Sequence, residues 1–406
     1  MVGLEPGFLM KLPIYMDYHA TTPVDPRVLA AMTPYLTERF GNPSSRSHSF
    51  GWQAAEAVEG ARGHVARLIG AHPKEIYFTS GATESDNLAI KGVALKHAER
   101  GGQLLTSPIE HKAVLDSCKW AVKQGVEVVF LAVDRFGIVN PAAVEEAISE
   151  NTLLVSIMLA SNEIGTIESI SEIGCITRSH GVLLHTDAAQ AVGKIPVDVS
   201  AMNIDLLSLT AHKMYGPKGI GAIYVRGGEP QELLSPILDG GGQESGLRPG
   251  TLNVPGIVGL GEACRLCYEE MAAESARLGG LRDRLRDGIM AELDEVHLNG
   301  HPTQRLSNNL NLSFGNIEGE ALLMSMSDVA VSTGAACNSA GSKGSYVLEA
   351  IGLPDDLIQS SIRIGLGRFT TEEEVDYVTR RFVESVRGLR ELSPHYAADR
   401  ANSPRR

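Results

Sequence analysis

The stretch "DLLSLTAHKMYGPKGIGA", residues 205–222, joins a short apolar run to a lysine and then to a glycine-rich turn. The apolar run predicts a buried β-strand, and Lys213 lies just beyond its end. A lone lysine in a turn is usually solvated. In parallel α/β sheets, however, ligands bind outside the carboxyl ends of the strands, so a polar residue at this place is a candidate for chemistry.

The same pattern recurs along the first two thirds of the chain. Further buried strands are predicted in "EIYFTS", "QLLTSP", "VEVVFLA", "TLLVSIMLA" and "GVLLHTD". Helical patterns such as "ESDNLAIKGVALKHAER" and "NPAAVEEAISE" separate most of these strands. This alternation predicts an α/β fold whose large domain contains a mainly parallel sheet.

A long helical stretch from about Val254 to Leu293 ends the alternation. Beyond it, the strands "NNLNLSF", "VAVSTG" and "SIRIGLG" mix with helices, which favours a smaller α+β domain. Chain ends often return to the same module, so the first 20 or so residues are expected to pack there as well. The predicted division is 22–265 for the large domain, with 1–21 and 266–406 forming the small one.

Composition excludes several classes of protein. Of 406 residues, 43% are hydrophobic and 21% charged, and the sequence contains no apolar run long enough for a membrane helix. The N-terminus does not resemble a signal peptide, which favours a cytoplasmic protein. A net charge of −13 argues against direct binding of nucleic acid. Five cysteines form no disulfide framework, so one of them is free to be chemical.

Polar residues gather where the predicted strands end. The turn "GATESDN" opens a helix and suits a phosphate, because helix N-termini attract anions. An aspartate keeps the nitrogen of an aromatic ring protonated, and a lysine amine holds the same molecule as a Schiff base, which is the pairing that pyridoxal phosphate enzymes use. The residues in question are Ala82, Thr83, His111, Asn162, Asp187, Gln190 and Lys213.

With these motifs in place, the sequence resembles the group I cysteine desulfurases of the NifS/IscS kind from about Lys11 to about Pro394. The resemblance is carried by "YMDYHATTPVDPRV", "FGNPSSRSHSFGWQAAEAV", "FTSGATESDNLAIKG", "EHKAVLD", "VSIMLASNEIG", "DAAQAVGKIPVDV", "HKMYGPKGIGA" and "SSIRIGLGRFTTEEEVDY". It implies the aspartate-aminotransferase-like fold, pyridoxal 5'-phosphate as cofactor and a homodimer. It also implies conversion of L-cysteine to L-alanine, with a persulfide left on the enzyme's own cysteine.

The resemblance also implies a role for each matching residue. Lys213 would form the Schiff base, Asp187 would pair with the ring nitrogen, and His111 would stack on the ring and transfer protons. Arg363 and Asn162 would receive the substrate carboxylate. The remaining cofactor contacts would come from Gln190 at the phenolic oxygen and, around the phosphate, from Ala82, Thr83, Thr210, His212 and, across the dimer, Thr251.

Cys337 in "VSTGAACNSAGSKGSYVL" is the predicted nucleophile, because the glycine, serine and asparagine around it predict a mobile loop. Such a loop would let the thiol reach the cofactor and then leave to deliver sulfur. Cys118 and Cys175 lie in helical patterns and are expected to be buried small hydrophobes. Cys264 and Cys267 form a C-x-x-C inside a helix without a second ligand pair, so no metal site is predicted.

Other functions stay open at this point. A selenocysteine lyase or another pyridoxal phosphate enzyme of the aminotransferase class would share the lysine, the aspartate and the fold, and a non-catalytic scaffold would have kept only the fold. The acceptor of the sulfur also stays open between an iron–sulfur scaffold protein and a tRNA-thiolation relay. Residues 1–9 precede the resemblance, and Met10 could itself be the start, so they are expected to contribute little to the core.

Overall fold

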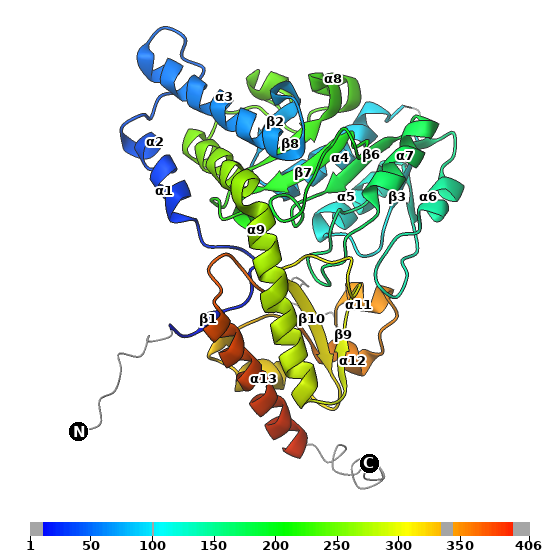
Figure 1. Ribbon diagram of the computed structural model, residues 1–406. Helices are drawn as coiled ribbons and strands as arrows, with labels where there is room; N and C mark the ends of the chain where they lie inside the picture. The colour runs from blue at the N-terminus through cyan, green and yellow to red at the C-terminus, as the bar shows by residue number, and fades with distance from the viewer. Residues whose placement is uncertain (1–10, 100, 334–343, 393–406) are drawn as a thin grey trace, which may run out of the picture.

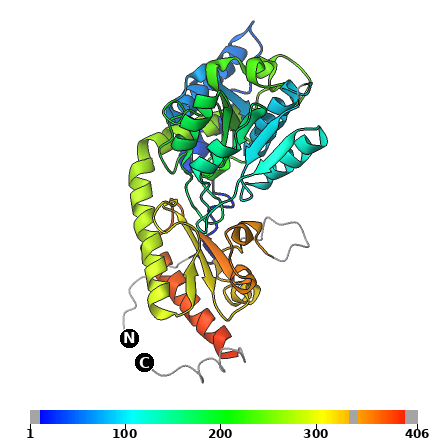
Figure 2. The ribbon, with the colours of Figure 1, turned by 90° about the vertical axis from the view of Figure 1, so that its right-hand side faces the viewer.

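The structure is a computed structural model that describes residues 11–99, 101–333 and 344–392. A large body and a small one lie one above the other, and the single helix α9 (Val254–Glu292) runs along both (Figures 1 and 2). With 39 residues at about 1.5 Å each, α9 is about 58 Å long. Its first half packs in the core of the large body and its second half in the core of the small one.

A seven-stranded sheet forms the centre of the large body. Its strands are β2 (Ile76–Thr79), β3 (Gln103–Thr106), β4 (Glu127–Phe130), β5 (Thr152–Ser156), β6 (Leu183–Asp187), β7 (Leu206–Thr210) and β8 (Gly221–Val225). They lie in the order β2-β8-β7-β6-β5-β3-β4. Only β8 runs antiparallel to its neighbours, so the predicted mainly parallel sheet is confirmed. The glycine-rich stretch after Lys213 is the turn that leads into β8.

Helices cover both faces of this sheet, which explains why its strands are apolar without alternation. Leu104 faces one helical layer and Leu105 the other, and Leu154 and Val155 divide in the same way. One layer contains α4 (Ala82–Lys96) and α5 (Lys112–Lys123). The other contains α3 (Ser49–Ile69), α6 (Pro141–Ala147), α7 (Ile170–His180) and the first half of α9. The short helices α1 (Pro26–Met32), α2 (Pro34–Thr37) and α8 (Pro230–Leu233) lie at the periphery (Figure 1).

The small body combines an antiparallel sheet with helices, as predicted. Its sheet has the order β12-β10-β9, and β1 pairs in parallel with β11 beside it. These strands are β1 (Ile14–Tyr15), β9 (Val296–Leu298), β10 (Asn309–Phe314), β11 (Val329–Ala330) and β12 (Ser361–Gly365). The helices are α10 (Gly319–Ser325), α11 (Tyr346–Ala350), α12 (Asp355–Gln359) and α13 (Glu372–Leu392). Phe314 and Phe382 stack at its centre, 5.6 Å between ring centroids.

The segment that follows Lys11 connects the two bodies. Ile14 and Met16 are buried in the small core, whereas the Thr22 and Asp25 backbone N–H groups donate to the carbonyls of His212 and Tyr215. The chain therefore passes the Lys213 turn on its way into the large body. The boundaries 22–265, 1–21 and 266–406 stay a prediction. Among the described residues, no helix combines the length and the apolar character that a membrane crossing requires.

Candidate active site

A cavity of about 570 Å³ opens where β2, β5, β6 and β7 end, between the two bodies. It gathers ten of the predicted residues, namely Ala82, Thr83, His111, Asn162, Asp187, Gln190, Thr210, His212, Lys213 and Arg363. Thr251 is exposed and does not line this cavity. Cys337 lies outside the described residues, as do residues 1–9. Most of the residues predicted at strand ends therefore line one cavity, and their roles stay a prediction.

The first turn of α4 forms one end of the cavity. Gly81 precedes the helix with φ +151°, a backbone conformation that favours glycine. No described side chain caps this helix end, and the first backbone N–H groups of any helix lack an intrahelical partner. Because residues 80–84 line the cavity, these donors and the positive end of the helix dipole suit an anion there.

The end of β7 adds two polar side chains to the same region. Thr210 is buried, and its hydroxyl donates to the Ile220 carbonyl at 3.3 Å. His212 Nδ1 lies 3.1 Å from the Thr21 hydroxyl. Burial, together with the charge of Lys213, lowers the pKa of His212 to about 4, so this imidazole is neutral at pH 7. His212 can therefore contribute a hydrogen bond to a phosphate but not a charge.

Lys213 ends the one-turn 3-10 helix Ala211–Lys213 that follows β7. Its Nζ donates to the backbone carbonyls of His19 and Ala20, at 2.5 and 2.6 Å. Those carbonyls belong to the segment that links the two bodies. The amine is thus held at the wall of the cavity by backbone carbonyls.

Asp187 is the last residue of β6 and is buried beside the cavity. One carboxylate oxygen accepts the Ala189 N–H at 2.9 Å. Burial raises the pKa of Asp187, while nearby His111 lowers it in part. A cationic partner such as a protonated ring nitrogen would compensate for this burial. Gln190, one turn on, donates to the His19 carbonyl at 3.0 Å and accepts from Lys194 at 2.9 Å.

His111 is the N-cap of α5, and this capping orients its ring. Its Nδ1 accepts the Ala113 backbone N–H at 3.2 Å. Since Nδ1 is an acceptor there, the neutral ring carries its proton on Nε2. His111 lines the cavity, and an imidazole nitrogen lies within 4.8 Å of an Asp187 oxygen. The ring is therefore placed to exchange a proton in the cavity.

Arg363 comes from the small body, in β12, and closes the opposite side of the cavity. It is 3% exposed. Its guanidinium donates to Asp17 Oδ1 at 2.9 Å and to the Asn162 carbonyl at 3.2 Å, and its buried Nε has no partner among the described residues. A planar guanidinium with an unused donor suits a carboxylate. The structure thus brings Arg363 and Asn162 together at one side of the cavity, and their role toward a substrate carboxylate stays a prediction.

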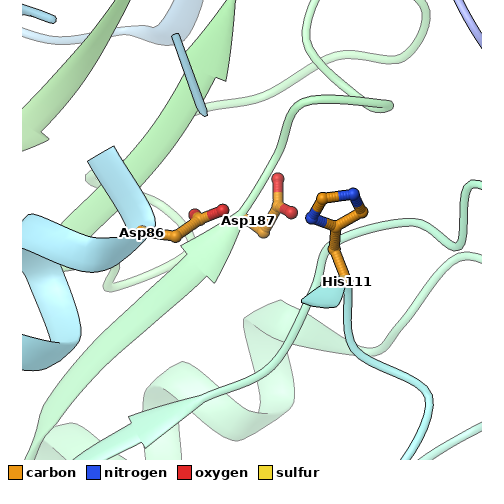
Figure 3. A group of neighbouring side chains, drawn as sticks. All are labelled: Asp86, His111 and Asp187. Atoms are coloured by element: carbon orange, nitrogen blue, oxygen red, sulfur yellow. The ribbon is translucent and has the colours of Figure 1, made fainter. Parts of the chain in front are cut away.

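His19 and Asp86 are among the residues of this region that were not predicted. His19 lines the cavity, with Nδ1 3.1 Å from Gln190 Oε1 and Nε2 3.2 Å from the Asn308 carbonyl. Asp86, in α4, is fully buried behind Asp187, and Figure 3 shows Asp187 between Asp86 and His111. His19 stands within the quoted motif "YMDYHATTP", which could have signalled it. Asp86 stands within the quoted motif "FTSGATESDNLAIKG", but it lies inside a helical pattern rather than at the end of a predicted strand.

The described cysteines lie away from the cavity. Cys264 and Cys267 are buried in α9, and burial raises the pKa of the Cys267 thiol to about 12, which leaves it inert. Cys118 is buried as expected. The expectation for Cys175 is wrong, because this thiol is exposed. It lies on α7, on a face of the helix that the sheet does not cover.

The groups that line the cavity fit pyridoxal phosphate. The open N-terminus of α4 offers N–H donors to an anion, the buried Asp187 carboxylate suits a protonated ring nitrogen, and Lys213 offers a primary amine. These three features surround one space of sufficient size. Arg363 remains for a second, smaller anion such as a carboxylate.

Comparisons with known proteins agree with this chemistry. The family described as aminotransferase class-V matches residues 14–378. The cysteine desulfurase IscS of Anaeromyxobacter dehalogenans is 58% identical over 387 residues, covering 95% of this chain and 96% of that protein. The cysteine desulfurase IscS of Azotobacter vinelandii is 56% identical over 387 residues, covering 95% of each chain.

Solved structures give the same result. A NifS-like protein superposes with a TM-score of 0.86 at 40% identity, covering 93% of this chain and 100% of its own. A structure described as SspA in complex with cysteine superposes with a TM-score of 0.79 at 41% identity, covering 88% and 100%. The predicted family, fold class and cofactor are thereby confirmed. The chain belongs to the IscS-type cysteine desulfurases within the aminotransferase class V family.

Proposed function

We propose that this protein removes sulfur from L-cysteine with the help of pyridoxal phosphate, leaves L-alanine, and carries the sulfur as a persulfide on Cys337. The observation that supports it most is the shared cavity, where the Lys213 amine, the Asp187 carboxylate, the α4 N-terminus and the Arg363 guanidinium meet. Each of these groups suits a different part of the cofactor or of the amino-acid substrate.

The cofactor would be held at three points. The first turn of α4, with Thr83, Thr210 and His212, would bind the phosphate, and Asp187 would pair with the ring nitrogen. Gln190 would contact the phenolic oxygen. When bound, pyridoxal phosphate supplies a carbonyl carbon that condenses with amines and a ring that accepts electrons from the substrate Cα. The Lys213 amine must leave the His19 and Ala20 carbonyls to reach that carbon.

The substrate would be oriented by its carboxylate. Arg363 has the donor geometry for a carboxylate and is fixed by Asp17 and by the Asn162 backbone. Because Arg363 comes from the small body and Asp187 from the large one, the substrate would lie between them. Such a position is expected to place Cα beside the groups that move protons.

Lys213 and His111 would move those protons. Lys213, once its amine is released, takes the proton from Cα, and His111 exchanges protons through the Nε2 that its capping contact leaves available. The sulfur then leaves Cβ and bonds to the Cys337 sulfur, while the carbon skeleton accepts a proton and departs as alanine. Cys337 is assigned from the sequence alone, since it lies outside the described residues.

The site would be completed in a homodimer. Leu36, Phe40, Phe50 and Trp52 are exposed near the start of the large body, and the Phe40 and Phe50 rings lie 5.4 Å apart. Exposed apolar patches of this kind mark interaction surfaces. Thr251, exposed and outside its own cavity, would contact the phosphate of the partner. The persulfide would serve a protein acceptor, either an iron–sulfur scaffold or a tRNA-thiolation relay.

A product assay tests the proposal. Purified protein reconstituted with pyridoxal phosphate is incubated with L-cysteine and a thiol reductant, without any keto acid. We expect alanine and sulfide in equal amounts. A requirement for a keto acid would instead indicate an aminotransferase, and turnover of selenocysteine but not cysteine would indicate a selenocysteine lyase.

A further inference from the structure

Asp86 is a buried acid that the proposed function does not use. It lies in the second turn of α4 and is 0% exposed. Neither carboxylate oxygen has a hydrogen-bond partner among the described residues. Unlike Asp187 and His111, Asp86 does not line the cavity. A buried acid without partners is costly, so its position calls for an explanation.

The surroundings of Asp86 contain a second acid at close range. One oxygen of Asp86, one oxygen of Asp187 and one nitrogen of His111 all lie within 4.8 Å of one another. Figure 3 shows the Asp86 carboxylate directed toward Asp187, with His111 on the far side. Two buried carboxylates this close cannot both be ionised, so the pair is expected to hold a proton.

The neighbouring groups decide which acid keeps that proton. Asp187 has the Ala189 N–H and the His111 ring beside it, and both favour its charged form. His185, on β6, lies 3.6 Å from Asp86 Oδ1. Burial lowers the pKa of His185 to about 3, so it brings no positive charge. Burial and the charge of Asp187 raise the pKa of Asp86 well above its usual range.

The other groups around Asp86 do not change which of the two acids holds the proton. Glu110, just before α5, also raises the pKa of Asp86 through its charge, and the nearby Ser208 hydroxyl of β7 opposes the shift although its hydrogen bond goes to His185 rather than to Asp86. The Ser208 hydroxyl is itself 3.0 Å from His185 Nε2. The proton therefore belongs on Asp86 and the charge on Asp187.

We propose that Asp86 is a positioning residue, a neutral carboxylic acid that directs its O–H at the Asp187 carboxylate and so keeps the negative charge of the pair facing the cofactor ring. This inference rests on the assignment of Asp187 to the ring nitrogen. Asp86 itself touches neither the cofactor nor the substrate. Its effect is on how firmly the ring is held.

The test measures the dissociation constant of pyridoxal phosphate for the apo protein between pH 6 and 8. The unmodified protein is compared with Asp86→Asn, whose amide also donates a hydrogen bond without charge, and with Asp86→Leu, which cannot donate. Lys91→Leu, farther along α4 and outside the cavity lining, is the control for changes in the helix. The visible band of the bound cofactor, and its absence in Lys213→Ala, first establishes that the cofactor occupies the proposed site.

We expect Asp86→Asn to bind within about threefold of the unmodified protein at each pH, and Asp86→Leu to bind about 10- to 100-fold more weakly. Equal weakening by Asn and Leu would overturn the proposal, because it would mean that Asp86 acts through its charge. Unchanged binding by Leu would overturn it as well. Should Asp86→Leu not fold, parallel pH curves for Asn and the unmodified protein support the proposal, and curves that diverge as pH rises contradict it.

Discussion

The Lys213 amine is held by two backbone carbonyls that belong to a different part of the chain from the lysine itself. These acceptors orient the amine toward the cavity without neutralising it, since a carbonyl carries no charge. The proposed function of Lys213 depends on a primary amine at this point.

Replacing Lys213 by alanine should therefore abolish the visible band of the lysine-bound cofactor. Turnover should fall by about 10²- to 10⁴-fold. Lys213→Arg should not restore either, because a guanidinium stays protonated and forms no Schiff base. Absorbance spectra of the reconstituted proteins check this. Lys218→Ala, a neighbouring lysine, should keep the band. A normal band in Lys213→Ala would contradict the assignment.

Arg363 should act on substrate binding rather than on the cofactor. Arg363→Lys keeps the charge but loses the planar fork, so the KM for L-cysteine should rise by about 10- to 100-fold. The affinity for pyridoxal phosphate should stay the same within about twofold, because Arg363 lies across the cavity from α4 and Asp187. Steady-state kinetics with a cofactor titration measures both. A cofactor affinity that falls as far as the substrate affinity would contradict this division of roles.

Sequence patterns favoured candidate residues near strand ends, whereas His19 and Asp86 were missed although each lies in a quoted motif. Asp187, His111 and Asn162 follow strands, and parallel strand ends necessarily meet at one edge of a sheet. Asp86 reaches the same place from inside a helix. Whether a helical acid points to solvent or to a second acid depends on how helix and sheet pack, and a single sequence does not contain that information.

At the scale of elements, the crossing of α3 and α9 relies on a glycine. A Cβ added at Gly261 would lie 2.6 Å from both Cα and Cβ of Ala61 in α3. Gly280 lies in the same helix, and a Cβ there would meet no atom within 4 Å. The two positions therefore form a matched pair.

Gly261→Ala should lower the free energy of unfolding by about 1–3 kcal/mol, since the two helices must separate to admit the methyl group. Gly280→Ala should raise it by up to about 1 kcal/mol, the helix propensity difference between the two residues. Denaturant unfolding of the three proteins provides the comparison. Stabilisation by both substitutions would show that the helices do not pack as closely as described.

The positions of helices and strands were predicted more accurately than which of their faces are buried. The helix expected from about Val254 to Leu293 is observed as Val254–Glu292. By contrast, Cys175 was expected to be buried and is exposed. Its helical pattern was recognised correctly, but the packed face of α7 is set by the sheet beneath it. Strand β8 begins inside the glycine-rich stretch that follows Lys213, where the sequence resembles a turn.

At the scale of the whole molecule, each body contributes part of the site, and the exposed patch around Phe40 is proposed to add a partner. Phe40 is 66% exposed, and Phe40→Glu should shift the protein toward monomers because a charge would be buried at the dimer interface. Sedimentation velocity measures the shift. Met324→Glu, at an 80% exposed position on α10, is the control and should remain dimeric. A dimeric Phe40→Glu protein would contradict the proposed interface.

The two-body architecture was predictable from the switch between strand–helix alternation and the long helix. How the bodies meet was not, because Arg363, His19 and Lys213 are far apart in the sequence and converge only in the folded chain. The resemblance of the ordered motifs to the cysteine desulfurases indicated only indirectly that the two bodies meet at this site. The surroundings of Asp86 and His19 are known only from the folded structure.

The most direct test of the account is to locate the sulfur atom after the protein has reacted with L-cysteine. Peptide mass analysis without reductant should find one additional sulfur on the peptide that contains Cys337. It should find none on the peptides of Cys118, Cys264 and Cys267, or on that of the exposed Cys175. The Cys337→Ser protein should bind the cofactor normally but carry no added sulfur and make no persulfide. Added sulfur at another cysteine, or full alanine production by Cys337→Ser, would contradict the account.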